Sequence, residues 1–172
     1  MALKSTIFKA ELQLADLDRS HFGDYSLTLA RHPSETDERM MVRLLAFALH
    51  ASDSLAFGRG LSTEDEADLL DTDLTGAIER WIDVGLPDEK DIHRACNRSR
   101  HVVVLSYGGR GAEIWWQQTA GKVQPLAGGR REHIDLDVLD VRHQHFGRGA
   151  WLEVVEGERV VAGVQLAARF DD

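Results

Sequence analysis

Hydrophobic and polar residues alternate in two stretches near the start of the chain, and this alternation predicts two β-strands. Every second residue is apolar in the segments 8–14 and 25–29, which is the period of a strand with one buried face. Residues 16–24 join the two segments. We therefore expect an antiparallel hairpin with a fairly long loop.

After Ser34 the apolar residues recur at every third or fourth position, which predicts a helix that runs to about His50. Ser34 is the expected N-cap residue and Asp37 its capping partner. Glu38 lies three residues before Met41 and seven before Leu45, which is one and two helical turns. It therefore belongs to the apolar stripe, and we expect its carboxylate to point at a sheet. The alternative is that Glu38 only complements the positive end of the helix. The stripe consists of Met40, Met41, Leu44, Leu45, Phe47 and Ala48.

Two acidic stretches, 64–73 and 79–83, are expected to fold back on each other across the turn 74–77. If the turn is centred on Thr75 and Gly76, apolar residues face apolar residues across the pair of strands and a negative charge faces a positive one, which stabilises the pairing. Glu79 would then face Thr72. The predicted opposite pairs are Asp68 with Asp83, Leu69 with Ile82, Leu70 with Trp81, and Asp71 with Arg80.

The second half of the chain predicts further helices and strands around one buried central strand. The continuous apolar, β-branched run 101–107 is typical of a strand that is covered on both faces. The other expected elements are a short helix from Pro87 to about Asn97, a helix at 112–122, a strand at 133–138, and a last hairpin of 151–155 with 159–167.

This order of elements predicts an α/β (α+β) protein, a single domain of residues 1–172 with a mixed sheet flanked by helices. The extra antiparallel strands at both termini would curl the sheet toward a roll. The chain has only three prolines, no internal repeat and no stretch with the composition of an interdomain linker.

Composition and charge narrow the function classes. A net charge of −9 argues against loose, sequence-independent nucleic-acid binding, which depends on a basic surface. It does not exclude a nuclease, because carboxylates that hold a metal add to the negative count. One cysteine, Cys96, excludes an internal disulfide and a cysteine-based zinc site. The chain has no apolar run of about 18 residues and no apolar stretch of a signal peptide at its start, so we expect a cytoplasmic protein.

The predicted pair of Asp68 and Asp83 is the strongest indication of chemistry in the sequence. Opposite residues of an antiparallel pair have Cβ atoms roughly 5 Å apart. Two carboxylates that close repel each other unless one is protonated or a cation lies between them. A divalent metal ion is the obvious cation. The alternative is an edge hairpin whose acidic residues are solvated.

Three segments resemble the YaeQ family of bacterial proteins: 31–41 (RHPSETDERMM), 79–90 (ERWIDVGLPDEK) and 114–118 (IWWQQ). The resemblance covers essentially the full chain. It implies a variant of the PD-(D/E)XK, restriction-endonuclease-like fold, an α/β roll, and dependence on Mg²⁺ or Mn²⁺.

The resemblance also implies which residues would form the site. Glu38 matches the helix glutamate of that superfamily, Asp68 the aspartate of the Pro-Asp dipeptide, with Ala67 in place of proline, and Asp83 the acidic residue of the second motif. Gly85 stands where a lysine is expected. The missing positive charge would then come from Lys90, or from Arg94 one turn later.

Two functions follow from the resemblance. The first is a Mg-dependent nuclease of unnamed substrate, in which Asp68, Asp83 and Glu38 hold a divalent ion and Lys90 positions or deprotonates the nucleophile. The alternative is a non-catalytic module that binds nucleic acid or protein and has kept the fold but lost the lysine. The net charge and Gly85 favour the alternative, whereas the three carboxylates favour the nuclease.

Overall fold

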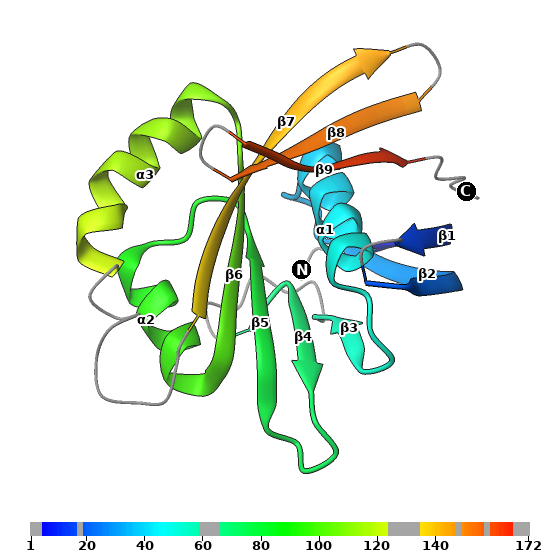
Figure 1. Ribbon diagram of the computed structural model, residues 1–172, viewed down its shortest axis with the longest axis horizontal. Helices are drawn as coiled ribbons and strands as arrows, with labels where there is room; N and C mark the ends of the chain where they lie inside the picture. Colours follow the sequence, from blue (N-terminus) through cyan, green and yellow to red (C-terminus); the bar gives the residue numbers. More distant parts are fainter. Residues whose placement is uncertain are drawn as a thin grey trace.

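The computed structural model describes residues 5–16, 19–58, 66–123, 135–146, 149–156 and 159–166, and it describes side chains as far as Val123. The described chain forms a large sheet, a separate two-stranded hairpin and the helices that pack between and beside them (Figure 1). The predicted α/β class, with its mixed sheet and flanking helices, is confirmed.

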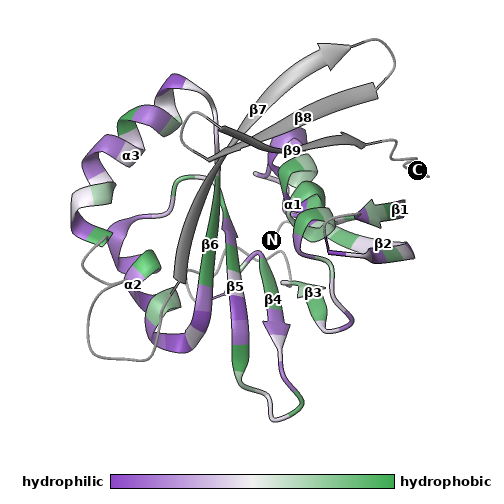
Figure 2. Ribbon diagram, in the orientation of Figure 1, coloured by the Kyte–Doolittle hydropathy of each residue, from purple (hydrophilic) through white to green (hydrophobic). Residues whose placement is uncertain are grey.

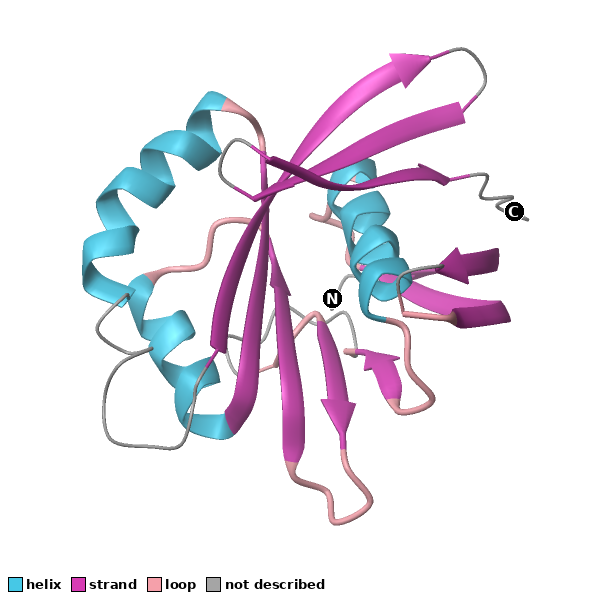
Figure 3. Cartoon of the chain, in the orientation of Figure 1, coloured by secondary structure: helices cyan, strands magenta, loops and turns pink. Residues whose placement is uncertain are grey.

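The large sheet contains a parallel centre with antiparallel strands on both sides. Strands β5, β6 and β7 are parallel, and all other neighbours in the sheet are antiparallel. Helix α2 (Glu89–Arg98) connects β5 to β6, and helix α3 (Arg110–Val123) lies between β6 and β7 in the chain (Figure 3). The strand order across the sheet is β3 (Leu55–Phe57), β4 (Leu69–Thr72), β5 (Ile78–Val84), β6 (Ser99–Tyr107), β7 (Asp135–Phe146), β8 (Gly149–Glu156) and β9 (Arg159–Leu166).

The hairpin of β1 (Thr6–Asp16) and β2 (His21–Arg31) lies beside helix α1 (Asp37–His50), on the side of the sheet opposite α2 and α3 (Figure 1). Phe47 of α1 shows how these parts meet, because its ring contacts Tyr25 of β2 and Phe57 of β3 at centroid distances of 5.2 and 5.4 Å. A helix that is covered on several sides buries most of its residues, and eight residues of α1 are buried.

Strand β6 divides the hydrophobic residues into two cores, one on each face of the sheet. Val103 and Leu105 pack with α1 and the hairpin, whereas Val102 and Val104 pack with α2 and α3. All four side chains are buried, as predicted for a central strand. Figure 2 shows apolar residues along α1 and the centre of the sheet, and both polar and apolar residues along α2 and α3.

The register predicted for the acidic hairpin is confirmed for three pairs: Leu69 with Ile82, Leu70 with Trp81, and Asp71 with Arg80. The predicted pairing of Glu79 with Thr72 is wrong, because Thr72 pairs with Ile78 and the register shifts between Asp71 and Thr72.

The turn explains this shift. The Asp73 carboxylate accepts hydrogen bonds from the backbone N–H groups of Thr75 and Ala77 and from the Thr75 hydroxyl. The Asp73 N–H group donates to the Ala77 carbonyl at 2.9 Å, and Gly76 has a φ of 84°. This tight turn closes one residue earlier than expected, so Glu79 becomes the extra residue of a bulge.

The first helix begins later than predicted. Its N-cap is Thr36, whose side chain accepts a hydrogen bond from the Arg39 N–H group, and not Ser34. The Glu35 N–H group bonds to the His32 carbonyl at 2.8 Å, so residues 32–35 form a turn before the helix. The first hairpin loop is shorter than expected, since β2 already begins at His21. Residues 133 and 134 of the predicted strand at 133–138 lie outside the described residues.

Among the described residues, no helix combines the length and the apolar character needed to cross a lipid bilayer.

Replacing Leu45 by alanine tests the core around α1. Leu45 has an exposed fraction of 0%, whereas Leu74 in the β4–β5 turn is fully exposed. Leu45→Ala is expected to lower the free energy of unfolding by about 2–5 kcal/mol, because it removes packing and leaves a cavity. The matched change Leu74→Ala should stay within about 0.5 kcal/mol of the wild type. Urea unfolding curves of both variants check this expectation, and equal losses would contradict the core assignment.

Candidate functional site

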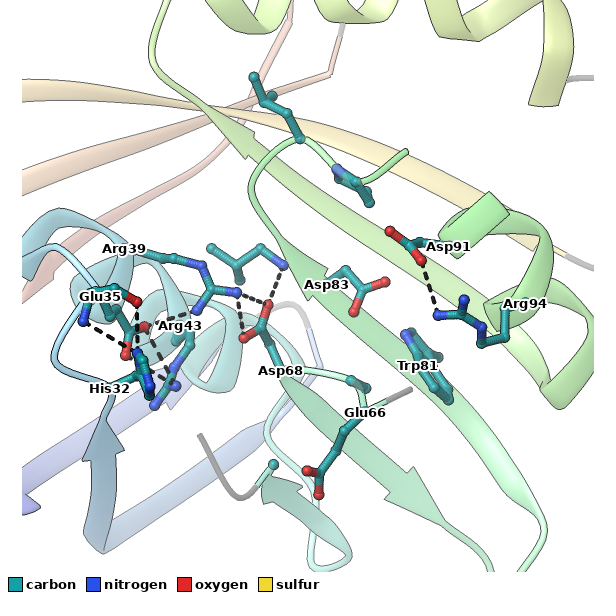
Figure 4. A pocket seen from close by; sticks show the side chains of 16 residues that line it. His32, Glu35, Arg39, Arg43, Glu66, Asp68, Trp81, Asp83, Asp91 and Arg94 are labelled. Carbon is teal, nitrogen blue, oxygen red and sulfur yellow. Dashed lines mark hydrogen bonds and ion pairs between the residues drawn. The ribbon is translucent and has the colours of Figure 1, made fainter. Parts of the chain in front are cut away.

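A cavity of about 430 Å³ opens where the approach to α1, the start of β4, the end of β5 and the first turns of α2 meet (Figure 4). The carboxyl end of a parallel strand is the usual position of ligand sites in sheets of this kind. The indole N–H of Trp115 on α3 donates to the Pro87 carbonyl at 2.8 Å, which fixes the connection from β5 to α2 at the edge of the cavity. The cavity is lined by His32, Ser34, Glu35, Arg39, Arg43, Gly58, Glu66, Ala67, Asp68, Trp81, Asp83, Val84, Leu86, Pro87, Asp91 and Arg94.

Asp68 lies directly before β4 and is held from two sides. Both of its carboxylate oxygens accept hydrogen bonds from Nη2 of Arg39, at 2.8 and 2.7 Å. One oxygen also accepts a bond from the Val84 N–H group of β5 at 2.8 Å. The side chain is only 12% exposed. Burial raises the pKa of Asp68, and the positive charge of Arg39 offsets part of that effect.

Arg39 is itself held by a buried carboxylate, that of Glu35. Glu35 lies in the turn before α1 with only 4% of its side chain exposed, and it pairs with Arg39 at 2.9 Å and with Arg43 at 3.5 Å. Arg43 in turn donates to the Ala30 carbonyl of β2. A buried carboxylate needs such partners to offset its lost hydration. Charges of alternating sign therefore run from the hairpin through α1 to Asp68.

Asp83 and Trp81 lie on the side of β5 that faces α2, and Asp83 points into the cavity (Figure 4). The Asp68 N–H group donates to its carboxyl group. Burial, followed by the negative charge of Asp68, raises the pKa of Asp83 to about 7. The indole N–H of Trp81, which faces the Asp83 carboxyl group, acts in the opposite direction, although among the described residues the buried Nε1 atom of Trp81 has no hydrogen-bond partner.

The structure brings together two of the four predicted site residues. Asp68 and Asp83 both line the cavity. The β4–β5 ladder ends one pair before them, at Leu69 and Ile82, and the Asp68 N–H group bridges the gap. Glu38 and Lys90 are exposed and do not line the cavity, whereas Arg94 does and pairs there with Asp91 at 2.9 Å.

The orientation predicted for Glu38 is wrong for a reason of helix geometry. The helix begins only at Asp37, so Glu38 lies in the first turn, beyond the part of α1 that packs on the sheet. The buried acidic residue is Glu35, which the prediction placed inside the helix. The spacing of Glu35, Arg39 and Arg43 at four-residue intervals is a sequence signal for ion pairs that would have pointed to this group.

The glycine at the expected lysine position has a conformational explanation. Gly85 has a φ of 116°, which side chains of L-amino acids rarely adopt. Its N–H group donates to the Leu105 carbonyl of β6 at 2.9 Å, so this backbone is tied to the sheet. A lysine at this position would strain the backbone.

The donor set of the cavity suits a magnesium ion only in part. Within the part of the chain whose side chains are described, no group of three or more His, Cys, Asp and Glu side chains is placed to hold a metal ion. Asp68 and Asp83 nevertheless supply two adjoining carboxylates. Mg²⁺ is commonly bound by one or two carboxylates together with water and substrate phosphates, so these two residues fit such an ion.

The ion pair between Arg39 and Asp68 predicts a pH-dependent loss of stability in Arg39→Gln. At pH 7 the variant leaves the buried Asp68 carboxylate without its cation, and the free energy of unfolding should fall by about 2–4 kcal/mol. Near pH 3 the loss should be smaller, because protonated Asp68 no longer needs the cation. Urea unfolding at the two pH values measures the difference. Arg110→Gln, an exposed change of equal charge, is the control. Equal losses at both pH values would contradict the role of the ion pair.

The raised pKa of Asp83 predicts how stability changes with pH. Between the ordinary pKa of 3.8 and the folded value of about 7, the folded protein binds more protons at this residue than the unfolded chain does. Its contribution to stability therefore falls as the pH rises through this window. Asp83→Asn has no carboxyl group to ionise, so its stability does not fall in this way. Its free energy of unfolding should exceed that of the wild type by up to about 4 kcal/mol at pH 7 and above. Unfolding curves from pH 4 to 8 measure the gain. A carboxyl ¹³C titration of Asp83 with a midpoint near 4 would contradict it.

Comparison with known proteins assigns the chain to a family. The family model described as "YaeQ protein" matches residues 1–158. A protein from Escherichia coli (strain K12), named "Uncharacterized protein YaeQ", is 54% identical over 128 residues, which are 74% of this chain and 70% of that protein. A Salmonella typhi protein of the same name is 53% identical over equal shares.

Two solved structures have the same fold. The crystal structure of a YaeQ protein from Xanthomonas axonopodis pv. citri matches with a TM-score of 0.69 and 41% identity, over 96% of this chain and 97% of that one. A YaeQ protein from Pseudomonas syringae matches with a TM-score of 0.69 and 28% identity, over 96% and 95%. The chain belongs to the YaeQ family.

Proposed function

We propose that this protein hydrolyses phosphodiester bonds with the help of a divalent metal ion, as a nuclease-like enzyme with a PD-(D/E)XK-type core. One observation carries the proposal: Asp68 and Asp83 together line a cavity that also contains arginine side chains. The order of the hairpin β4–β5, helix α2 and parallel strand β6 supports the assignment of the core.

In this proposal Asp68 and Asp83 hold the ion, and Mg²⁺ or Mn²⁺ is the expected metal. A bound ion would supply an activated water molecule and offset the charge that develops on the phosphate. Arg94 takes the place proposed for Lys90, because it lines the cavity. Arg39 holds the Asp68 carboxylate in position through its two hydrogen bonds. Glu38 has no part in the proposed site.

The setting proposed for this activity is the cytoplasm, with nucleic acid as the partner. The lone thiol, Cys96, is buried, and burial raises its pKa to about 11. Such a thiol is inert toward oxidation and fits a reducing compartment.

A non-catalytic binding module remains the second candidate, and one contact favours it. Arg39 already neutralises the Asp68 carboxylate without any metal ion. A site of this kind can be purely structural. The net charge of −9 also limits sequence-independent contact with nucleic acid.

Calorimetric titration with Mn²⁺ separates the two candidates. The wild type should bind one ion, and Asp83→Asn should lose that binding because a neutral amide attracts a divalent cation much less strongly than a carboxylate does. Asp24→Asn removes one carboxylate from the exposed part of β2 and should bind as the wild type does. Cleavage of single- and double-stranded DNA and RNA with Mn²⁺ then tests catalysis. Equal heats in all three proteins, or cleavage that survives Asp83→Asn, would argue against the proposal.

A further inference from the structure

The cavity has two sides, which the carboxyl groups of Asp68 and Asp83 separate. On the α1 side, each arginine is already paired with a buried carboxylate: Arg39 with Glu35 and Asp68, and Arg43 with Glu35. The α2 side contains Trp81 of β5 and Arg94 of α2 (Figure 4). Arg94 is likewise paired, with Asp91, so the two sides differ in the indole N–H of Trp81, which the described residues leave without a hydrogen bond.

Trp81 presents a buried donor that the described residues leave without a hydrogen bond. The side chain is 4% exposed and lines the cavity, and its Nε1 atom, which faces the Asp83 carboxyl group, has no hydrogen-bond partner among those residues. Buried N–H groups are nearly always paired in folded proteins, so an unpaired one requires an explanation. A hydrogen-bond acceptor that is supplied by a ligand provides that explanation.

Trp81 is also held in place beside Asp83 before any ligand arrives. Its strand neighbours in the ladder are Leu70 of β4 and Val102 of β6. The guanidinium group of Arg98 lies over its ring at 5.8 Å. A donor held this rigidly loses little entropy when it binds an acceptor.

Arg94 lies on the same side of the cavity and adds positive charge. It extends from α2 toward β5, one turn before Arg98, and it is held by Asp91 at 2.9 Å. Guanidinium groups bind phosphate oxygens with several hydrogen bonds in a plane. Together, an indole N–H and a guanidinium group favour an anionic acceptor over a neutral one.

We propose that the α2 side of the cavity, formed by Trp81 Nε1 and Arg94, binds a phosphate group of a ligand no larger than a nucleotide. The volume of about 430 Å³ is at the small end of ligand pockets. The position beside Asp83 places the phosphate next to the carboxyl pair. The biological use of this subsite rests on the proposed hydrolysis, but the binding itself does not.

The binding test uses three ligands and no metal ion. Inorganic phosphate and thymidine 5′-monophosphate are titrated by calorimetry, and thymidine, which lacks the phosphate, is the matched control. Both phosphate compounds should bind and thymidine should not. Tighter binding of the nucleotide than of inorganic phosphate would identify a phosphate ester as the ligand, whereas equal affinity would identify the free anion. Binding of thymidine as tight as that of its monophosphate, or binding of none of the three, would overturn the proposal.

Variants then locate the binding. Trp81→Phe keeps the ring and removes only the N–H group, and Arg94→Gln removes the charge. Each should weaken binding of the monophosphate about tenfold, as expected for loss of one hydrogen bond to a charged group. The controls are Trp116→Phe and Arg110→Gln, whose side chains do not line the cavity. Thermal unfolding of all four variants identifies any that fail to fold.

The indole resonance of Trp81 supplies a readout that does not depend on the variants. In a ¹⁵N-labelled protein, the Nε1–H signal of Trp81 should shift on addition of the monophosphate, and that of Trp115 should not, because Trp115 already donates to Pro87. An unchanged Trp81 signal would overturn the subsite. A subsite that binds phosphate in a protein that does not bind Mn²⁺ would leave this inference standing and remove the proposed hydrolysis.

Discussion

The buried ion pair between Arg39 and Asp68 is the contact on which the geometry of the cavity depends. It joins the first helix to the point where β4 begins, and Asp68 also bonds to the backbone of β5 at Val84. Residues from three separate elements therefore meet at one carboxylate. Glu35 extends the connection, because it pairs with both Arg39 and Arg43. Arg43 in turn bonds to the Ala30 carbonyl of the N-terminal hairpin. A buried carboxylate tolerates this position only while its partners stay in place.

This contact also makes the two aspartates different from each other. Asp68 has a guanidinium partner, whereas Asp83 has the Asp68 charge as its nearest strong electrostatic neighbour and a pKa of about 7. Pairs of carboxyl groups whose surroundings separate their pKa values can take different roles in one reaction. Burial raises the pKa of both carboxyl groups, and the guanidinium group of Arg39 offsets part of that effect only at Asp68.

Much of the fold follows from the sequence because local pattern and long-range packing agree. The run 101–107 is apolar on both faces since β6 separates two cores. The pairs from Leu69 with Ile82 to Asp71 with Arg80 follow from matched side chains across the ladder. The bulge at Glu79 does not follow from this matching, because it results from the three bonds to the Asp73 carboxylate in the turn.

The site was harder to predict because it depends on where elements begin and end. A shift of the N-cap from Ser34 to Thr36 exchanged the expected orientations of Glu38 and Glu35, because Glu38 is exposed and the Glu35 side chain is buried. Lys90 and Arg94 are four residues apart on one helix, and only the packing of α2 decides that Arg94 lines the cavity. Such positions vary with a single turn of helix, whereas sequence patterns fix helix ends only to within a few residues.

An arginine in place of the lysine that the resemblance implies changes the chemistry that is open to the proposed site. A lysine with a lowered pKa can accept a proton, whereas an arginine stays protonated and cannot act as a base. Gly85 excludes an unstrained lysine at the end of β5, and the cation that lines the cavity from α2 is Arg94. In the proposed hydrolysis, Arg94 therefore stabilises negative charge on the phosphate and does not accept the proton of the attacking water, while Asp68 and Asp83 act as ligands of the ion.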